Sequence, residues 1–428
     1  MNRIAAEANQ QSIDFIKHNN GAGLLSLITS RSSYSGKMHQ NQGAPLIDHA
    51  TEIAQNHRQK LLRSGQGKSR SGPYRQRLVR TSVRDGWQLV VRAALYFERA
   101  YDTSVRAAIA ECFEEYVQAV PDKLTFVWNN GKAAQAITMA KPIAVLATLL
   151  TPEDRFDFDY VGGKEPTDAS LYQFSVVGLR QRQEKAGNRG FNALSFSWPS
   201  ANVLSNPDAF VKLFFDAASR LGTAHGHAGF AVYLSPTSVN QHESTEYLIS
   251  RMLPGLDVGV PSDLATRQLK GRIKTVDWMT AIDQSMLDAV GGLSRLRSEL
   301  PQEWFAIGDY GRGIVVRAGV IPDSGASDVD GQPPVVPPAY IVLDHALRMI
   351  RTNDLDALQH GSVSGEAATY NTAKSTTEWL RRYEVSDEVL QNAQIAILET
   401  PKLSENNEIF HVSVISWPHG QSCSRCPK

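Results

Sequence analysis

The chain has 428 residues, of which 42% are hydrophobic and 21% are charged, a composition typical of globular proteins. The length predicts two or three domains, or one large domain with extensions. The longest apolar stretch, 142–150, is far shorter than the roughly 20 residues that a membrane span needs, which argues against a transmembrane protein. Three cysteines cannot form a disulfide framework, and the N-terminus has no apolar core of signal-peptide type, so we expect a cytoplasmic protein.

The formal net charge is zero, but the charge is unevenly distributed along the chain. Residues 54–84 contain nine lysines or arginines and no acid, whereas residues 85–428 contain 31 basic and 40 acidic residues, a net charge of −9. An acidic body would attract a basic partner and raise its association rate, although an acidic surface also serves solubility. Residues 1–85 are rich in polar residues and glycine, and we expect them to form a weakly ordered basic extension.

Regular structure is expected to begin with the apolar run 87–97, which predicts a buried strand. Apolar residues that recur every three or four positions predict helices over 103–120 and 207–221. The same spacing predicts a helix over 277–290 that is capped by Asp277. Further strands are expected at 124–128, 171–179, 193–198, 229–234, 305–307 and 313–320, further helices at 243–252, 338–350 and 376–382, and irregular links at 152–160 and 322–338.

Strands that occur in neighbouring pairs as well as alternating with helices favour an α+β fold, with mixed or antiparallel sheets and packed helices. The same strand-helix-strand order occurs at 87–128 and at 193–234, which suggests two related halves. We expect a main domain over 86–384, with a division into subdomains near 150–170. The basic extension 1–85 would precede it, and a C-terminal extension, 385–428, would follow it.

Three short motifs have the spacing of metal ligands, but each is incomplete. The histidines of His225-x-His227 lack a third converging ligand, which favours a packed pair at a glycine-rich turn. The CxxC at 423–426 is half a zinc site in a polar tail. The segment around Asp328 and Asp330 fails the calcium-loop pattern at its first and twelfth positions, and we interpret it as an exposed acidic loop. We therefore predict no metal and no cofactor.

The sequence also lacks the common catalytic motifs. It contains no serine nucleophile elbow, no phosphate-cradling glycine loop and no zinc-protease helix, which argues against an enzyme and leaves a hydrolase with an unrecognised site as a third hypothesis. The basic run 58–84 suggests an alternative function as a nucleic-acid-binding module. Only Tyr74 is interleaved there as a stacking aromatic, so a disordered basic leader is the favoured interpretation.

Several segments between residues 87 and 384 resemble, in order and spacing, the type VI secretion immunity family whose members neutralise VRR-type nuclease toxins. Besides the strand at 87–97 and its following helix, these segments are AHGHAGFAVY, SRMLPGLDVG, IKTVDWMTAIDQSMLDAVGG, GIVVRAGVIPDSG, PPAYIVLDHALRMIR and TEWLRRYE. The resemblance implies a cytoplasmic bacterial protein that binds a toxin delivered by sister cells. It also implies that the protein blocks this toxin directly, without chemistry.

The resemblance carries over a set of residues that we expect to be mostly scaffold: His225, Gly226, Gly229, Pro254, Gly255, Asp257, Asp277, Trp278, Gly291, Gly292, Gly319, Pro322, Trp379 and Arg382. Trp278 is expected to be a core anchor, and the glycines to permit turns or close packing. Acidic side chains are the expected toxin contacts, with Asp257, Asp323, Asp328 and Asp330 as candidates, because an acidic body could mimic DNA phosphates and occlude a positively charged nuclease cleft.

Overall fold

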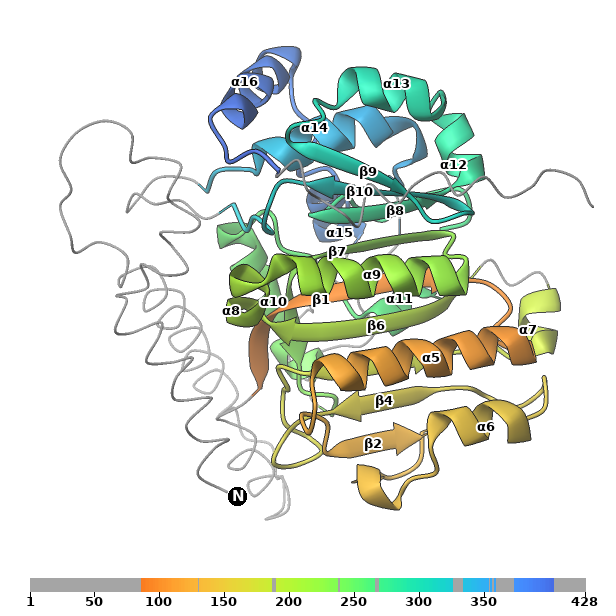
Figure 1. Cartoon of the computed structure of the whole chain (residues 1–428). Coiled ribbons are helices and arrows are strands. Elements are labelled where there is room, and N and C mark those ends of the chain that lie inside the picture. Colours follow the sequence, from red (N-terminus) through yellow and green to blue (C-terminus); the bar gives the residue numbers. More distant parts are fainter. Residues whose placement is uncertain are drawn as a thin grey trace, which may run out of the picture.

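A single open sheet of ten strands runs through the computed structural model, which describes residues 86–403 except 130, 187–189, 238, 266–268, 326–333, 354, 356–357 and 359–372 (Figure 1). The strand order is β3-β2-β4-β5-β6-β1-β7-β8-β10-β9, and every neighbouring pair is antiparallel. The strands are β1 (Trp87–Phe97), β2 (Phe126–Asn129), β3 (Gln135–Ala136), β4 (Phe158–Val161), β5 (Gln173–Val177), β6 (Asn192–Pro199), β7 (His225–Leu234), β8 (Met279–Asp283), β9 (Phe305–Asp309) and β10 (Gly313–Ala318).

Helices cover both faces of this sheet (Figure 1). They are α5 (Thr103–Ala119), η1 (Ile137–Met139), α6 (Ile143–Leu149), α7 (Gln181–Lys185), α8 (Ser200–Ser205), α9 (Pro207–Leu221), α10 (Val239–Met252), α11 (Pro261–Ala265), α12 (Gln284–Ala289), α13 (Gly292–Glu299), α14 (Pro338–Leu347), η2 (Arg348–Ile350), α15 (Ala373–Leu380) and α16 (Asp387–Leu398). None of the helices in the described part of the chain has the length and apolar character that a bilayer crossing requires.

One face of the sheet is apolar and packs against α5 and α9. Phe196 of β6 makes ring contacts with Phe210 of α9 at 5.3 Å and with Tyr116 of α5 at 5.8 Å between centroids. Phe174 of β5 and Tyr160 of β4 contact Phe113 of α5 in the same way. These aromatic residues belong to the large buried core that unites the strands with both helices.

The opposite face of the sheet is unusually polar for an interior surface. Side chains that are directly opposed in neighbouring strands share one face of a sheet. The register places Asp159, Ser175 and Ser195 in one row across β4, β5 and β6, and continues this row through Ala94 of β1 to His227 of β7. A parallel row joins Gln173, Ser197 and Arg92 across β5, β6 and β1. This polar face lies under α10, α11 and the segment that connects them (Figure 1).

The α+β class is confirmed, and so are several elements with strong local sequence signals. The expected strand at 87–97 is β1, and the helix expected over 207–221 is α9, which begins at a proline and ends at Gly222 in the left-handed conformation with φ +54°. The strands expected at 305–307 and 313–320 are confirmed as β9 and β10, which pair antiparallel. At the start of α5, Asp102 holds the N-cap position, but its carboxylate pairs with Arg99 instead of capping the helix.

Two predictions about regular structure are wrong. The helix expected over 277–290 is instead strand β8 followed by the short helix α12, which is capped by Asp283 through its Oδ1 and the Met286 N–H at 2.9 Å. Strand β8 lies between β7 and β10, and its residues 279–282 are all buried, so the strand has no alternation of buried and exposed side chains. The link expected at 152–160 contains β4, whose aromatic and acidic residues alternate between the two faces of the sheet.

The suggested halves are not equivalent in the sheet. Strands β6 and β7 flank β1 directly, whereas β1 and β2 are separated by three other strands. One sheet carries strands from both sides of residues 150–170, so no division into two sheets occurs there. The expected C-terminal extension, 385–428, begins with helix α16. Ala393 and Ile397 of this helix belong to the main core, so the helix packs on the main domain. The extension 1–85 and residues 404–428, including the CxxC, lie outside the described residues.

Candidate functional site

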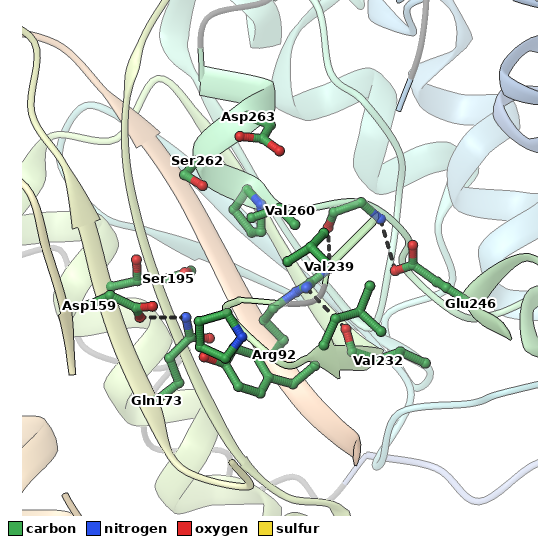
Figure 2. A pocket seen from close by; sticks show the side chains of 16 residues that line it. Arg92, Asp159, Gln173, Ser195, Val232, Val239, Glu246, Val260, Ser262 and Asp263 are labelled. Atoms are coloured by element: carbon green, nitrogen blue, oxygen red, sulfur yellow. Dashed lines mark hydrogen bonds between the residues drawn. The ribbon is translucent and has the colours of Figure 1, made fainter. Parts of the chain in front are cut away.

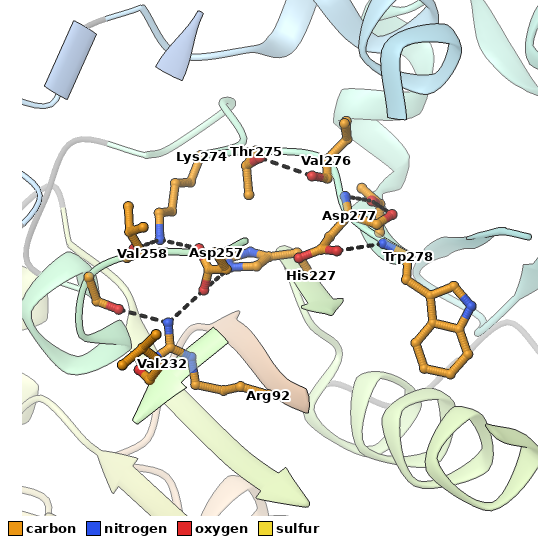
Figure 3. Close-up of polar contacts among 12 residues, drawn as sticks. Arg92, His227, Val232, Asp257, Val258, Lys274, Thr275, Val276, Asp277 and Trp278 are labelled. Atoms are coloured by element: carbon orange, nitrogen blue, oxygen red, sulfur yellow. Dashed lines mark hydrogen bonds and ion pairs between the residues drawn. The ribbon is translucent and has the colours of Figure 1, made fainter. Parts of the chain in front are cut away.

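A cluster of charged side chains is buried on the polar face, with the carboxylate of Asp257 at its centre (Figure 3). Arg92 Nη2 lies 2.7 Å from Asp257 Oδ2, and Lys274 Nζ lies 2.5 Å from Oδ1. His227 Nε2 lies 3.2 Å from Oδ2. None of the four residues is more than 4% exposed. They come from β1, β7 and two irregular segments, so one carboxylate ties four parts of the chain together.

The protonation states of the cluster follow from burial and neighbouring charges. Burial opposes ionisation of Asp257, but Lys274 and Arg92 hold its pKa well below the ordinary value. Burial lowers the pKa of His227, and burial together with His227 lowers that of His225 to about 3. Both histidines are therefore neutral, and the ring of His225 stacks on that of Tyr96 at 4.5 Å. Asp257 is thus an ionised acceptor shared by Arg92 and Lys274.

Two further buried carboxyl groups border the cluster in a protonated or partly protonated form. Burial raises the pKa of Glu246 to about 7 and that of Asp277 to about 8. Glu246 Oε1 accepts the Gly259 N–H at 3.0 Å, and Asp277 Oδ1 accepts the Trp278 N–H at 2.8 Å. The cluster therefore holds fewer negative charges at neutral pH than its number of carboxyl groups suggests.

Gly229 makes room for the carboxyl group of Asp277. A Cβ atom at position 229 would lie 1.8 Å from Asp277 Oδ1. We expect Gly229→Ala to lower the free energy of unfolding by about 1–3 kcal/mol, because a buried side chain must shift to admit a methyl group. Urea denaturation measures this loss. In an Asp277→Ser background the same change should cost less, since the opposing atom is gone, and an equal cost in both backgrounds would contradict the steric explanation.

A second group of contacts joins the turn at Pro254, the loop after β10 and α15. The guanidinium of Arg382 stacks 3.5 Å from the ring centroid of Trp379 and donates to the Pro254 carbonyl at 2.8 Å. Gly255 donates its N–H to the Ser324 carbonyl at 2.9 Å. A Cβ at Gly255 would lie 2.1 Å from the carbonyl oxygen of Asp323, so only glycine fits at this position.

A cavity of about 260 Å³ opens beside the charged cluster, on the polar face (Figure 2). Arg92 separates the two sites, since it lines the cavity and also binds Asp257. The lining residues are Arg92, Asp159, Gln173, Ser175, Ser195, Val232, Tyr233, Leu234, Pro236, Val239, Glu246, Gly259, Val260, Pro261, Ser262 and Asp263. The cavity is therefore built from five adjacent strands, α10 and the start of α11.

The family can be assigned from a comparison with known proteins. Residues 108–383 match the family model TsiV, described as type VI immunity for VRR-NUC. The chain belongs to this immunity family. Among solved structures, the Pseudomonas aeruginosa T6SS protein PA0821 is similar, with 33% sequence identity, a TM-score of 0.70, and coverage of 75% of this chain and 89% of that chain. A search of curated proteins gives no match.

Most residues that the resemblance to the immunity family singled out lie in or beside the two groups of contacts. Asp257 is the centre of the charged cluster, and His225, Gly229 and Asp277 lie beside it. Pro254, Gly255, Trp379 and Arg382 belong to the second group. Trp278 is fully buried, stacks with Phe210 and donates from Nε1 to the Gly319 carbonyl at 3.0 Å. Gly226 lies in β7, Pro322 is buried near the second group, and Gly291 and Gly292 form the turn between α12 and α13 with φ of +90° and +84°.

The four acidic residues expected to contact the toxin lie in different environments. Asp257 is 1% exposed and bound to two cations, so the structure places it in the interior rather than on a contact surface. Asp323 is half-buried, and its Oδ1 accepts the Gly325 N–H at 3.0 Å. Asp328 and Asp330 lie outside the described residues. Two cationic partners hold Asp257 in the interior, Arg92 at a separation of 165 residues in the sequence and Lys274 at a separation of 17.

The sequence interpretation missed the polar face and its cavity. One signal was present, because Arg92 interrupts an otherwise apolar strand, and an arginine buried in a strand requires an acidic partner. A second signal was the alternation of Ser195 and Ser197 with Leu194 and Phe196 in β6. No local pattern could name Asp257 and Lys274 as the partners of Arg92.

Proposed function

We propose that this immunity protein neutralises a VRR-NUC toxin by binding it directly and blocking the access of DNA to its active site. The match of residues 108–383 to the immunity family carries this proposal. The net charge of −9 over residues 85–428 supports it, because a DNA-cleaving enzyme holds its substrate on a positively charged surface. No chemical step by the immunity protein is required. Since the toxin would attack DNA, the protein would act in the cytoplasm.

The decisive experiment combines the purified protein with its cognate toxin, identified from the neighbouring reading frame. We expect a one-to-one complex that buries about 1,600 Å² or more and that stops DNA cleavage at equimolar concentration. Preformed complex should no longer retain DNA. If the protein already stops DNA cleavage completely at concentrations well below that of the toxin, a catalytic mechanism would replace the proposed masking.

The acidic loop gives a test of where the toxin binds. Reversal of Asp323, Asp328 and Asp330 to Lys should slow association with the toxin by at least about tenfold, because attraction between opposite charges accelerates encounter. Stopped-flow fluorescence measures the rate at two salt concentrations. The matching Asn variants should slow association less, and their difference from the Lys variants should shrink at high salt. An unchanged association rate would remove this loop from the interface.

A further inference from the structure

We propose that the cavity on the polar face receives a guanidinium or ammonium group, supplied by an arginine or lysine side chain of the toxin. This inference rests on the proposed function and adds a specific contact to it. It would make the cavity, rather than the charged cluster beside it, the part of the polar face that recognises the partner.

The wall formed by the strands presents hydrogen-bond acceptors. Asp159, Ser175 and Ser195 are directly opposed on β4, β5 and β6, so their side chains line the cavity side by side. Ser195 is 5% exposed, and its hydroxyl has no hydrogen-bond partner among the described residues (Figure 2). This hydroxyl lies in the wall of the cavity, where a polar ligand or water can satisfy it. This observation is independent of the charges in the cavity.

The charges of the lining favour a cation. Three carboxyl groups, those of Asp159, Glu246 and Asp263, line the cavity together with one guanidinium, that of Arg92. Both terminal nitrogens of Arg92 are already bound, Nη2 to Asp257 and the Gly259 carbonyl and Nη1 to the Val232 carbonyl. Gln173 Nε2 donates to Asp159 Oδ1 at 2.8 Å, which uses one of the two N–H donors of this amide. The lining therefore carries more carboxyl groups than guanidinium groups, and its guanidinium is already bound to Asp257, so a ligand rich in donors and positive charge suits it.

Burial makes the carboxylate of Asp159 less stable without a positively charged partner. It raises the pKa of Asp159 to about 6, although the hydrogen bond from Gln173 acts in the opposite direction. A cation in the cavity would stabilise the ionised carboxylate and reverse the shift. Arginine provides five donors in a fixed planar fork, which suits several acceptors arranged on one wall.

The size and opening of the cavity fit a single side chain. Its volume of about 260 Å³ lies just below the roughly 300–1,000 Å³ of typical small-molecule sites. Arg92 and Ser195 at the floor are buried, whereas Ser175, Val260 and Ser262 are half-buried, so the cavity opens to solvent. Arginine is enriched among the residues that dominate binding at protein interfaces, where it fills such pockets. A DNA-cleaving toxin also carries basic side chains for its substrate.

Two substitutions test the cavity with the intact protein and its cognate toxin. Ser175→Leu reduces the open space from the half-buried rim, and Asp159→Asn removes a charge without changing the shape. We expect each to weaken toxin binding at least about tenfold in calorimetry, with the melting temperature changed by only a few degrees. Ser294→Leu on α13 and Glu114→Gln on α5 are matched controls at exposed positions, and they should bind as the unmodified protein does.

Two further measurements identify the source of the cation. We expect one arginine or lysine of the toxin to weaken binding when it is changed to alanine. In a double-mutant cycle, the loss of binding free energy from this change and that from Asp159→Asn should not be additive. Free arginine should compete with the toxin for the unmodified protein. If Ser175→Leu and Asp159→Asn both bind the toxin normally, the cavity proposal is overturned while toxin masking stands. A different outcome is that free arginine raises the melting temperature of the unmodified protein but not that of Asp159→Asn, while both cavity variants bind the toxin normally. In that case the ligand of the cavity is a small molecule, and the toxin contact is excluded. If the unmodified protein does not bind the toxin, both proposals fail.

Discussion

Replacement of Asp257 by alanine is expected to lower the free energy of unfolding by about 3–5 kcal/mol, the cost typical of removing one partner from a buried ion pair. Asp257 is 1% exposed and accepts from Arg92 and Lys274, which are 4% and 1% exposed. Without the carboxylate, Arg92 and Lys274 remain buried next to each other. The other carboxyl groups at the cluster, those of Glu246 and Asp277, are not fully ionised at neutral pH and cannot fully replace it. Urea denaturation at pH 7, followed by tryptophan fluorescence, measures the loss.

Two comparisons isolate the electrostatic part of this effect. Asp216→Ala breaks a surface pair with Lys212 and should cost less than about 1 kcal/mol. Adding Arg92→Met and Lys274→Met to Asp257→Ala should recover part of the stability, because apolar residues of similar volume often replace a buried ionic group without loss. A stability of Asp257→Ala equal to that of Asp216→Ala would show that the cations find other partners.

The sequence was sufficient for elements in which local signals agree with the final packing. The helix α9 has a proline at its start, a periodic apolar stripe that includes Phe210 and Phe214, and Gly222 in the left-handed conformation at its end. Strand β8 shows the opposite case. Met279, Thr280, Ala281 and Ile282 are all buried, so neither face of the strand is marked by a row of exposed side chains. An uninterrupted apolar run has no period of two, so its spacing is also compatible with a helix.

The site was less accessible to sequence analysis than the fold, because it depends on register between distant strands. Asp159, Ser175 and Ser195 are adjacent only because β4, β5 and β6 pair at particular positions. Asp277 was expected to cap a helix, and its actual environment depends on Gly229, which lies 48 residues earlier in the chain. Short-range patterns indicate that such residues are buried or exposed, but they do not identify the neighbours that determine their chemistry.

Asp277 should make the stability of the protein depend on pH. Burial, and to a smaller extent the charge of Asp257, raises the pKa of Asp277 from 3.8 to about 8 in the folded state. At pH values between these two, the folded protein holds a proton on Asp277 that the unfolded chain releases. The contribution of this residue to stability is therefore fully present below the unfolded pKa and is lost as the pH rises through the folded pKa.

In the Asp277→Asn variant this dependence should disappear, since the amide keeps the shape of the protonated acid at every pH. Between pH 5 and pH 7 we expect the free energy of unfolding of the unmodified protein to decline more steeply than that of the variant, by about 1.4 kcal/mol per pH unit, the value for one proton. Urea denaturation at pH 5, 6 and 7 gives both slopes, and Glu114→Gln on the exposed side of α5 is a control that should leave the slope unchanged.

Glu246, Asp159 and Asp344 also have raised pKa values and remain in the variant, so only the difference between the slopes reports on Asp277. Equal slopes would mean that Asp277 is ionised in the folded protein. The carboxyl group packed against Gly229 would then be a carboxylate rather than a neutral acid.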